Sequence, residues 1–348
     1  MNQVMVMRYP EFLKPNGTIG FVAPSFGAAE EPYKSAFLRA VERFRAMGYR
    51  TVTGPNCFAA EGVGISSTPE RCGAELNKMY LSAGADVLLS VGGGELMCET
   101  VPYIKFTAIA AAEKPKWYMG FSDNTNFTFL SATLADTAAI YGPNAASFGM
   151  EPLHRSLTDA LDVLTGAADT VRGYDQWELT SEKDAEHPLA PYHLTERTAY
   201  RYFQCTGDSA KLEGRLLGGC VDCLVTLLGT RFDRVQDFNE RYRDDGVIWF
   251  LECCDLNPFG MRRAYWQMRE AGWFDTAKGF IIGRPAHYSE ELMGCGRFTA
   301  LEPLLSLGKP VIADADLGHL PPMLPLVTGA LAEVEAAGNE LTARYRFE

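Results

Sequence analysis

The sequence has no uninterrupted apolar run long enough to cross a membrane. Its N-terminus also lacks a basic segment followed by an apolar core and a small-residue cleavage site. Basic residues are the minority, with 32 Lys and Arg against 44 Asp and Glu. The resulting net charge of −12 argues against nucleic acid or an anionic membrane as a partner. We therefore expect a cytoplasmic protein.

Nine cysteines in 348 residues are too few for a disulfide framework. Cys220-x-x-Cys223 and the adjacent Cys253-Cys254 invite comparison with zinc ligands. However, the first pair falls where a helix is expected to start, and adjacent cysteines in a strand point to opposite faces. We therefore expect these thiols to act as small apolar side chains, with no metal bound.

Short apolar strands alternate with helices along the first half of the chain. Near-continuous apolar runs at Thr18–Pro24, Ala85–Val91 and Trp117–Phe121 are typical of strands in a parallel sheet covered on both faces. Apolar residues at helical spacing predict a helix over about 32–47, which Gly48 ends. The sequence therefore predicts an α/β fold, and 348 residues are enough for two domains.

The second half repeats this pattern after a segment of different character. Strands are expected at Glu213–Leu217, at Gly246–Leu251 and at Phe280–Ile282, followed by a β-hairpin near the C-terminus. Residues 166–205 are charged and proline-bearing, which indicates a linker or a long loop. Its aromatic residues, such as Trp177 and Tyr192, either line a ligand cleft or anchor an exposed linker. The sequence does not distinguish these two roles.

Ser122 lies in the stretch WYMGFSDNT, where a buried strand runs into the start of a helix. Such a turn exposes the serine hydroxyl beside free backbone N–H groups, which suits a nucleophile and its oxyanion. The hydrolase pattern G-x-S-x-G is not met, because Asn124 stands at the last glycine position. A helix N-cap is the alternative role for Ser122. The glycines Gly92–Gly94 end a neighbouring parallel strand at the same sheet edge, which favours the nucleophile.

A nucleophilic serine needs a general base, and the sequence holds only five histidines. His319 is the best candidate, since the stretch LGHLPP holds it in a stiff loop, and His287 is the second. Either histidine can also be purely structural. Glu252 ends an apolar strand, so its carboxylate needs a partner. That partner is the histidine, or alternatively Arg262 or Arg263 in a salt bridge.

A series of motifs in a fixed order runs through most of the chain: LKPNGTIGFVAPS, SVGGG, GFSDNT, YGPN, GRLLGG, FLE, GFIIGRP and LGHLPPMLPLVTGA. In this order they resemble the LD-carboxypeptidase family of serine peptidases, which includes the microcin-C immunity peptidases. Only residues 166–205 lie outside the resemblance. It implies an enzyme, a serine carboxypeptidase that hydrolyses an amide.

The resemblance also implies the domain layout. A Rossmann-like N-terminal domain with a parallel sheet would occupy residues 1–165 and carry the nucleophile. Residues 166–205 would form a linker or substrate loop. A smaller mixed α/β C-terminal domain would occupy residues 206–348, with the cleft between the two domains. Members of the family are typically cytoplasmic homodimers that need no metal or cofactor.

The resemblance further implies a catalytic triad. Ser122 would be the nucleophile, His319 the general base and Glu252 the residue that orients His319. A carboxylate on the far side of an imidazole fixes its tautomer and stabilises the imidazolium. The amides of Asp123 and of Gly93 or Gly94 would form the oxyanion hole, because a side chain there would hold the carbonyl oxygen away.

Three departures from the family pattern concern the substrate. Cys220 replaces an asparagine on the substrate side, and SVGGGEL differs from the RGG-type turn of murein-recycling members. The long 166–205 segment is similar to the immunity-peptidase branch, where it contributes an aromatic residue, here Trp177 or Tyr192. Two substrates are therefore expected as alternatives. One is a murein tetrapeptide that loses its terminal D-alanine, and the other is a peptidyl- or aminoacyl-nucleotide.

A different class of function is a nucleotide-binding α/β protein without peptidase activity. Gly92–Gly94 would then be the phosphate loop. The pattern G-x-G-x-x-G requires a further glycine at the position of Met97, so this alternative has the weaker support.

Overall fold

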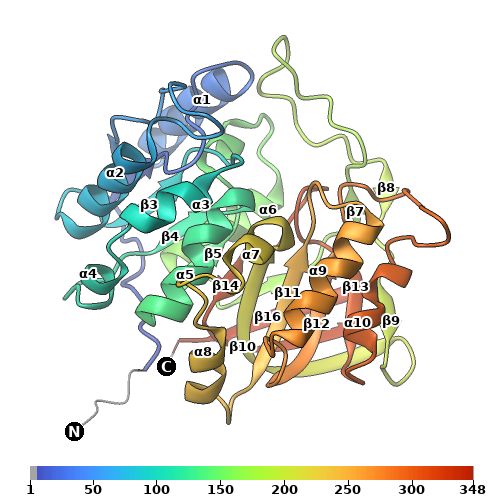
Figure 1. The fold of residues 1–348 in the computed structure, drawn as a ribbon. Helices are drawn as coiled ribbons and strands as arrows, with labels where there is room; N and C mark the ends of the chain where they lie inside the picture. Colours follow the sequence, from blue (N-terminus) through green and yellow to red (C-terminus); the bar gives the residue numbers. More distant parts are fainter. Residues whose placement is uncertain (1–5, 348) are drawn as a thin grey trace, which may run out of the picture.

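Strands β1 to β5 of the first half, together with β14, form a six-stranded sheet in the computed structural model, which describes residues 6–347 (Figure 1). The strand order is β14-β5-β4-β3-β1-β2. Strands β1 to β5 pair in parallel, and β14 pairs antiparallel with β5. The strands are β1 Thr18–Val22, β2 Arg50–Thr53, β3 Val87–Ser90, β4 Tyr118–Gly120, β5 Ala139–Tyr141 and β14 Leu326–Thr328. The predicted parallel sheet is confirmed.

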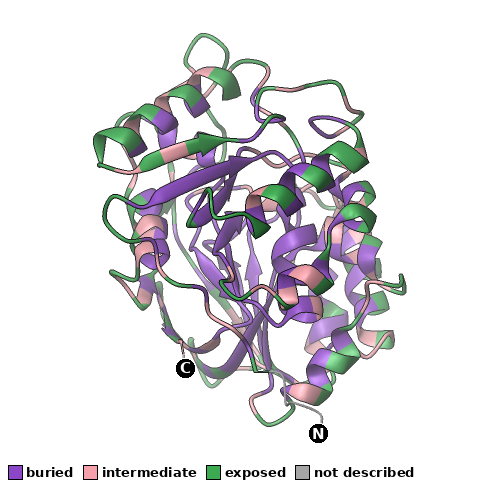
Figure 2. Ribbon diagram, turned by 90° about the vertical axis from the view of Figure 1, so that its left-hand side faces the viewer, coloured by how far each residue is buried: buried purple, intermediate pink, exposed green. Residues whose placement is uncertain are grey.

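Helices α1, α2 and α6 of this half each bury one face, whereas α5 is buried nearly all round. In α1 the buried side chains include Phe37, Val41 and Phe44, at the spacing that the sequence predicted. The centre of the molecule is buried throughout, while the helices expose their outer faces (Figure 2). The helices are α1 Tyr33–Ala46, α2 Pro69–Leu81, α3 Met97–Thr100, α4 Phe106–Ala110, α5 Thr125–Ala135 and α6 Arg155–Thr165.

The second half forms an eight-stranded mixed sheet in the order β6-β16-β15-β10-β11-β12-β13-β9. Strands β10 to β13 pair in parallel, and the flanking strands are antiparallel. The expected C-terminal hairpin is confirmed as β15 and β16. The strands are β6 Thr170–Arg172, β9 Arg201–Phe203, β10 Ser209–Cys220, β11 Val247–Glu252, β12 Ala277–Gly283, β13 Val311–Ala315, β15 Leu331–Ala337 and β16 Glu340–Arg346.

The two halves share one continuous apolar core. Phe129 of α5 stacks on Trp273 at 5.4 Å between ring centroids, and Trp249 of β11 lies 5.9 Å from Trp273. All three rings are fully buried. Helices α9 and α10 lie across one face of the second sheet (Figure 1). The helices of this half are α7 Val221–Leu227, α8 Val235–Arg241, α9 Pro258–Glu270 and α10 Glu302–Leu305.

Residues 166–205 do more than join the two halves. They supply β6 and β9, which form the opposite edges of the second sheet, and they also contain a small ribbon of β7 Gln176–Trp177 and β8 Glu196–Arg197. In the other direction, β14 comes from the second half of the chain and completes the first sheet. After β13 of the second sheet, the chain therefore returns to the first sheet at β14.

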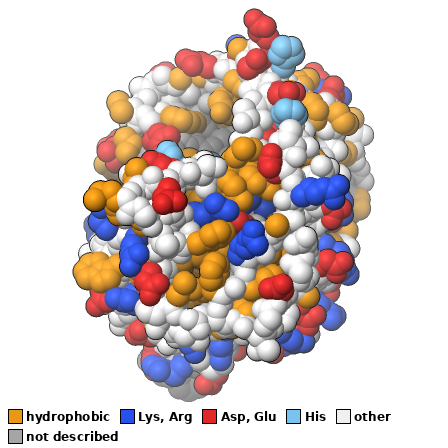
Figure 3. Space-filling model, turned by 90° about the vertical axis from the view of Figure 1, so that its right-hand side faces the viewer, with side chains coloured by type: hydrophobic (Ala, Val, Ile, Leu, Met, Phe, Trp, Pro, Cys, Tyr) orange, Lys and Arg blue, Asp and Glu red, His pale blue; other side chains and the backbone are white. Residues whose placement is uncertain are grey.

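The outer surface carries both signs of charge. On the face shown in Figure 3, Lys and Arg side chains are interspersed with Asp and Glu rather than gathered in one basic patch. Within residues 6–347, every helix is too short or too polar to span a membrane.

A buried ion pair fixes the 166–205 segment to the loop that follows β13. Arg284 and Asp316 are both almost fully buried and lie 2.6 Å apart. The other Asp316 oxygen accepts hydrogen bonds from the Tyr174 amide at 2.8 Å and the Tyr200 hydroxyl at 2.6 Å. The guanidinium of Arg284 lies over the ring of Trp177, 4.8 Å from its centroid. The 166–205 segment thus holds the loop after β13 through its hydrogen bonds to Asp316.

Replacing Asp316 by Asn should lower the free energy of unfolding by about 3–5 kcal/mol, because the buried Arg284 charge loses its counter-ion. Glu335→Gln is the matched control, since it breaks the Lys211–Glu335 pair, which is largely exposed. That change should cost less than about 1 kcal/mol. Urea denaturation measures both. Equal, small losses would show that the buried pair does not anchor the segment.

Candidate active site

Ser122 follows β4 directly and adopts an unusual backbone conformation. Its φ is +64°, a left-handed value that costs a residue with a side chain about 1–2 kcal/mol. The turn is held by the Asn124 amide group, which donates to the carbonyls of Gly92 at 2.8 Å and Phe121 at 3.1 Å. Neither the helical turn at Ser122 nor α5 has a side-chain cap. The N-cap alternative for Ser122 therefore does not hold.

The Ser122 hydroxyl lies in a chain of hydrogen bonds that joins the two sheets. Its Oγ is 2.9 Å from Nε2 of His319, and Nδ1 of His319 is 2.8 Å from Oε2 of Glu252. Glu252 is the last residue of β11 and is only 1% exposed. His319 lies in the loop between β13 and β14, which runs from the second sheet to the first. The structure thus brings together three residues that are far apart in the sequence.

The rival partners named from the sequence are occupied elsewhere. His287 is exposed and pairs with Glu290 at 3.2 Å. Arg262 donates to the carbonyl of Thr299 at 3.0 Å. Within residues 6–347, Glu252 forms no ion pair with Arg262 or Arg263. The salt-bridge alternative for Glu252 is therefore wrong.

Tyr141 is a member of this site that the sequence reasoning missed. Its hydroxyl donates to the second oxygen of Glu252 at 2.6 Å and accepts from the backbone N–H of Ser122 at 3.1 Å. It thereby links the carboxylate of Glu252 to the strained turn that carries Ser122. Tyr141 ends β5, the strand beside β4, so its position at the same sheet edge as Ser122 was the available signal.

The electrostatics of the pair suit a general base with a fixed tautomer. Burial opposes a charged imidazole, but the Glu252 carboxylate and the Cys254 thiol outweigh it and raise the pKa of His319 well above its ordinary value. Burial likewise opposes ionisation of Glu252, but the charge of His319 and hydrogen bonds from His319 and Tyr141 lower its pKa. An ionised Glu252 only accepts, so in the neutral imidazole Nδ1 carries the proton and Nε2 can accept one from Ser122.

Two glycines allow the close approaches that this geometry requires. Gly318 has φ +99°, and a Cβ there would lie 2.6 Å from Oε2 of Glu252. A Cβ on Gly93 would lie 3.2 Å from Oγ of Ser122. No backbone carbonyl among residues 6–347 accepts from the amides of Gly93 and Gly94. Asp123 follows Ser122 at the start of a helical turn, where the amide has no intrahelical acceptor.

The side chain of Asp123 holds the surrounding loops in place. It is 2% exposed and accepts from the Ser25 hydroxyl at 2.5 Å, the Met97 amide at 2.8 Å and Asn126 at 3.0 Å. Burial raises the pKa of this carboxyl. Ser25, which was not singled out from the sequence, follows β1 at the same edge. The Asp123 carboxylate therefore ties the ends of β1, α3 and α5 to the turn that carries Ser122.

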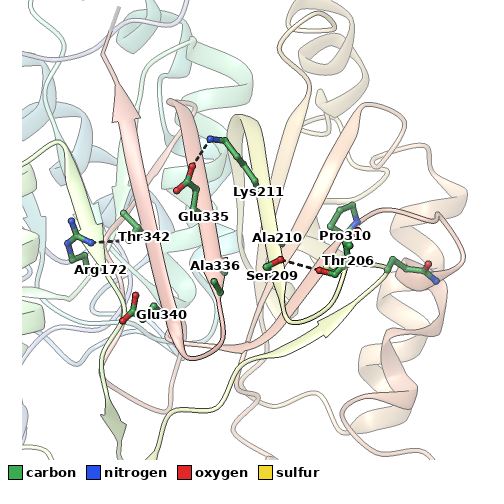
Figure 4. Close-up of a pocket in the computed structure, with 13 residues that line it drawn as sticks. Arg172, Thr206, Ser209, Ala210, Lys211, Pro310, Glu335, Ala336, Glu340 and Thr342 are labelled. Carbon is green, nitrogen blue, oxygen red and sulfur yellow. Dashed lines mark hydrogen bonds and ion pairs between the residues drawn. The ribbon is translucent and has the colours of Figure 1, made fainter.

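Three cavities meet at these residues. One of about 70 Å³ lies beside Ser122 and Cys220, and one of about 310 Å³ lies beside Ser122 and His319. A third, of about 230 Å³, is lined by His319 and Tyr192. A wider groove of about 750 Å³ lies on strands β6, β10, β15 and β16, and none of Ser122, Glu252 and His319 lines it (Figure 4).

The three residues proposed for substrate contact differ in whether they line one of these cavities. Cys220 is buried, its amide donates to Thr125 at 2.9 Å, and it lines the smallest cavity. Tyr192 lines the cavity that His319 shares. Trp177 is 3% exposed beneath Arg284 and lines none of the three cavities. It packs there because the segment folds back under the loop after β13.

The cysteines do not form a metal-binding group. All nine are free thiols. Cys253 faces the hydroxyl of Tyr265 at 3.5 Å, whereas Cys254 lines the cavities at Ser122, so the adjacent pair points to opposite sides. Across the described part of the chain, no three His, Cys, Asp or Glu residues are arranged to hold a metal ion.

A serine, a histidine and a carboxylate joined by hydrogen bonds on an α/β fold form an arrangement typical of serine hydrolases. Comparison with known families agrees with this class. The family model of the LD-carboxypeptidase N-terminal domain matches residues 19–142, and that of the C-terminal domain matches residues 213–334. The chain therefore belongs to the LD-carboxypeptidase family of serine carboxypeptidases.

Individual relatives cover nearly the whole chain. The Microcin C7 self-immunity protein MccF of Escherichia coli is 26% identical over 99% of this chain and 98% of its own length. A Bacillus subtilis (strain 168) protein named "Probable murein peptide carboxypeptidase" is 24% identical over 97% of this chain and 95% of its own. The structure of MccF in complex with glutamyl sulfamoyl guanosine has a TM-score of 0.79, 21% identity, and coverage of 98% and 99%. The fold is thus shared.

The imidazole of His319 should titrate above the ordinary histidine value of 6.5, and Glu252→Gln should lower its pKa because the attracting charge is lost. Histidine-selective NMR on the Ser122→Ala protein measures both titrations. Glu99→Gln, which removes an exposed carboxylate elsewhere, is the control and should leave the titration unchanged. If Glu252→Gln leaves the pKa of His319 where it was, the carboxylate does not set the charge state of the base.

Proposed function

We propose that this protein hydrolyses an amide near the carboxyl end of a small peptide or peptidyl conjugate, through an acyl-enzyme on Ser122. The observation that carries the proposal is the chain of hydrogen bonds from Ser122 through His319 to Glu252. Membership of a serine carboxypeptidase family supports the reaction type. The family membership also removes the support for a nucleotide-binding protein without peptidase activity.

In the acylation step, Ser122 Oγ attacks the scissile carbonyl while Nε2 of His319 takes its proton. Glu252 stabilises the imidazolium and keeps the ring oriented, and Tyr141 holds Glu252 by its second oxygen. His319 then returns the proton to the leaving nitrogen. In the second step a water molecule attacks the acyl-enzyme, again with His319 as the base.

The oxyanion would be held by backbone amides next to Ser122. The amide of Asp123 and that of Gly93 or Gly94 are the donors that we propose. Their support is the absence of a backbone acceptor for the two glycine amides within residues 6–347 and the close approach of Gly93 to Oγ. Donors fixed in the backbone need no reorganisation when the negative charge develops, so they favour the transition state over the ground state.

The leaving group would lie on the His319 side, because His319 must reach its nitrogen. Lys183 lines both cavities on that side, and its ammonium suits a leaving group with a carboxylate or phosphate. A terminal amino acid supplies the first and a nucleotide the second. MccF has been seen in complex with aspartyl sulfamoyl adenosine, which supports a peptidyl-nucleotide as the alternative to a murein tetrapeptide. The family resemblance is also the support for a homodimer that needs no cofactor.

Ser122→Ala and His319→Ala should each lower kcat by roughly 10⁴- to 10⁶-fold, and the two losses should not add in the double variant. Glu252→Gln should cost less. A fluorophosphonate should label the wild-type protein at Ser122 and leave Ser122→Ala unlabelled, as mass spectrometry of the tryptic peptide measures. His287→Ala is the control and should keep wild-type turnover. Loss of activity in His287→Ala with full activity in His319→Ala would overturn the assignment.

Tyr192→Ala separates the two substrate classes. Stacking on a nucleobase contributes about 1–3 kcal/mol, so the change should raise KM for a peptidyl-nucleotide by roughly ten- to a hundredfold. A murein tetrapeptide has no ring to stack, and its KM should change little. Trp177→Phe is the matched control, because that buried side chain supports the fold and should alter stability without altering either KM. Equal, small changes of KM on both substrates would remove the support for the nucleotide.

A further inference from the structure

Asn144 follows β5 and reaches the cleft beside the turn that carries Ser122. It precedes a helical turn over Ala145–Gly149, at the N-cap position that asparagine commonly fills. Its side chain does not cap this turn, however, and it lines the cavity of about 310 Å³ that Ser122 and His319 also line. The residue is only 6% exposed. A polar side chain buried to this extent is expected to have hydrogen-bond partners, and they must lie outside its own helical turn.

The hydrogen bonds of Asn144 fix which way its amide group points. Its Oδ1 accepts from the backbone N–H of Phe121 at 3.2 Å and from Nδ2 of Asn124 at 3.2 Å. A backbone N–H only donates, so the atom of Asn144 that faces Phe121 is the oxygen. The assignment of Asn124 agrees, because its Nδ2 also donates to the carbonyl oxygens of Gly92 and Phe121. The nitrogen of Asn144 therefore points away from these donors.

Nδ2 of Asn144 is a donor without a partner beside the nucleophile. Among residues 6–347 it has no hydrogen-bond acceptor, since Asn144 bonds only through Oδ1. The position that a Cβ on Gly93 would occupy lies 3.8 Å from this Nδ2 and 3.2 Å from Oγ of Ser122. The space left by the missing side chain of Gly93 is thus bordered by both the nucleophile and a free N–H donor. A buried donor without an acceptor is costly, so a ligand that brings an acceptor into this space is favoured.

We infer that Nδ2 of Asn144 is a side-chain donor of the oxyanion hole, in addition to the backbone amides. This inference rests on the proposed function and adds a catalytic residue to it. As Oγ of Ser122 bonds to the carbonyl carbon, its proton passes to Nε2 of His319, and the π electron pair of the carbonyl group moves onto the oxygen. That oxygen lies in the space beside Gly93 and accepts from Asn144. Asn144 itself gives up no proton, so it returns unchanged when the carbonyl group re-forms.

The surroundings of Asn144 suit a donor of this kind. Because its Oδ1 is held by two hydrogen bonds, Nδ2 is in place before substrate binds and needs little reorganisation as negative charge develops. Both bonds come from the turn around the nucleophile, since Phe121 precedes Ser122 directly and Asn124 follows it two residues later. Nucleophile and donor therefore keep one relative position.

The test compares p-nitrophenyl acetate with its thiono analogue, in which sulfur replaces the carbonyl oxygen, with both rates corrected for Ser122→Ala. Sulfur is a weak acceptor, so hydrogen bonds to this atom contribute little with the thiono ester. Asn144→Ala should lower kcat/KM for the oxygen ester by roughly 10²- to 10³-fold, the usual effect of removing one donor from an oxyanion hole. The loss for the thiono ester should be less than about tenfold.

Two further variants separate the donor of Asn144 from its acceptor. Asn144→Asp keeps an oxygen for the N–H groups of Phe121 and Asn124, but it removes the donor and adds a negative charge. It should hydrolyse the oxygen ester at least as slowly as Asn144→Ala does. Asn257→Asp is the matched control, because Asn257 accepts from the amide of Gly260 at 2.9 Å and lines none of the three cavities at Ser122. It should keep the wild-type rate.

The rate of fluorophosphonate labelling at Ser122 measures the same loss without an ester, because the phosphoryl oxygen takes the place of the oxyanion. Equal losses on the oxygen and thiono esters in Asn144→Ala would show that the side chain only supports the turn, and this inference would be wrong. A wild-type rate in Asn144→Asp would contradict it as well. If the wild-type protein neither hydrolyses the esters nor takes a fluorophosphonate label at Ser122, the proposed function fails instead.

Discussion

The hydrogen bond between His319 and Glu252 is the constraint on which the rest of the site depends. Glu252 belongs to the second sheet, while Ser122, which His319 contacts, directly follows a strand of the first. The relative position of the two sheets therefore fixes the distances along the chain of hydrogen bonds from Ser122 to Glu252. The stacked rings of Phe129, Trp249 and Trp273 make that position rigid, because close-packed aromatic cores do not deform continuously. The geometry of this hydrogen-bond chain thus depends on the interface between the two halves.

Around this contact, the charged side chains of one cavity are all acidic, whereas a basic side chain also lines the other two. Glu95 and Asp255 line the cavity beside Cys220, and Lys183 lines the two cavities that His319 lines. Between them lie Ser122 and the glycines Gly93 and Gly94, which line the cavity of about 310 Å³. The cavities around Ser122 thus differ in the charge of the side chains that line them. The protein as a whole has a net charge of −12, so the Lys183 ammonium group differs in sign from the molecule around it.

The sequence predicted those parts of the site whose position follows from the end of a single strand. Ser122 and Gly92–Gly94 follow apolar runs, and the parallel sheet that those runs specify brings them to one edge. The sheet edge at which Tyr141 lies could be predicted, but its bond to Glu252 could not, because that bond depends on where the end of β11 in the other sheet lies. Trp177 was one of two candidates for substrate contact, because the 166–205 segment resembles that of the immunity-peptidase branch. The segment folds back, however, and the tryptophan is buried under the ion pair of Arg284 and Asp316.

The return of the chain to the first sheet at β14 has a consequence for how this protein can evolve. The strand that completes the first sheet follows the loop that carries His319, so the first half cannot fold with its full sheet unless the second half is present. Neither half is then a module that recombination could transfer intact to another protein. New substrate ranges must arise by substitution or insertion within the whole chain, and residues 166–205 are the place where length can vary without breaking the central strands.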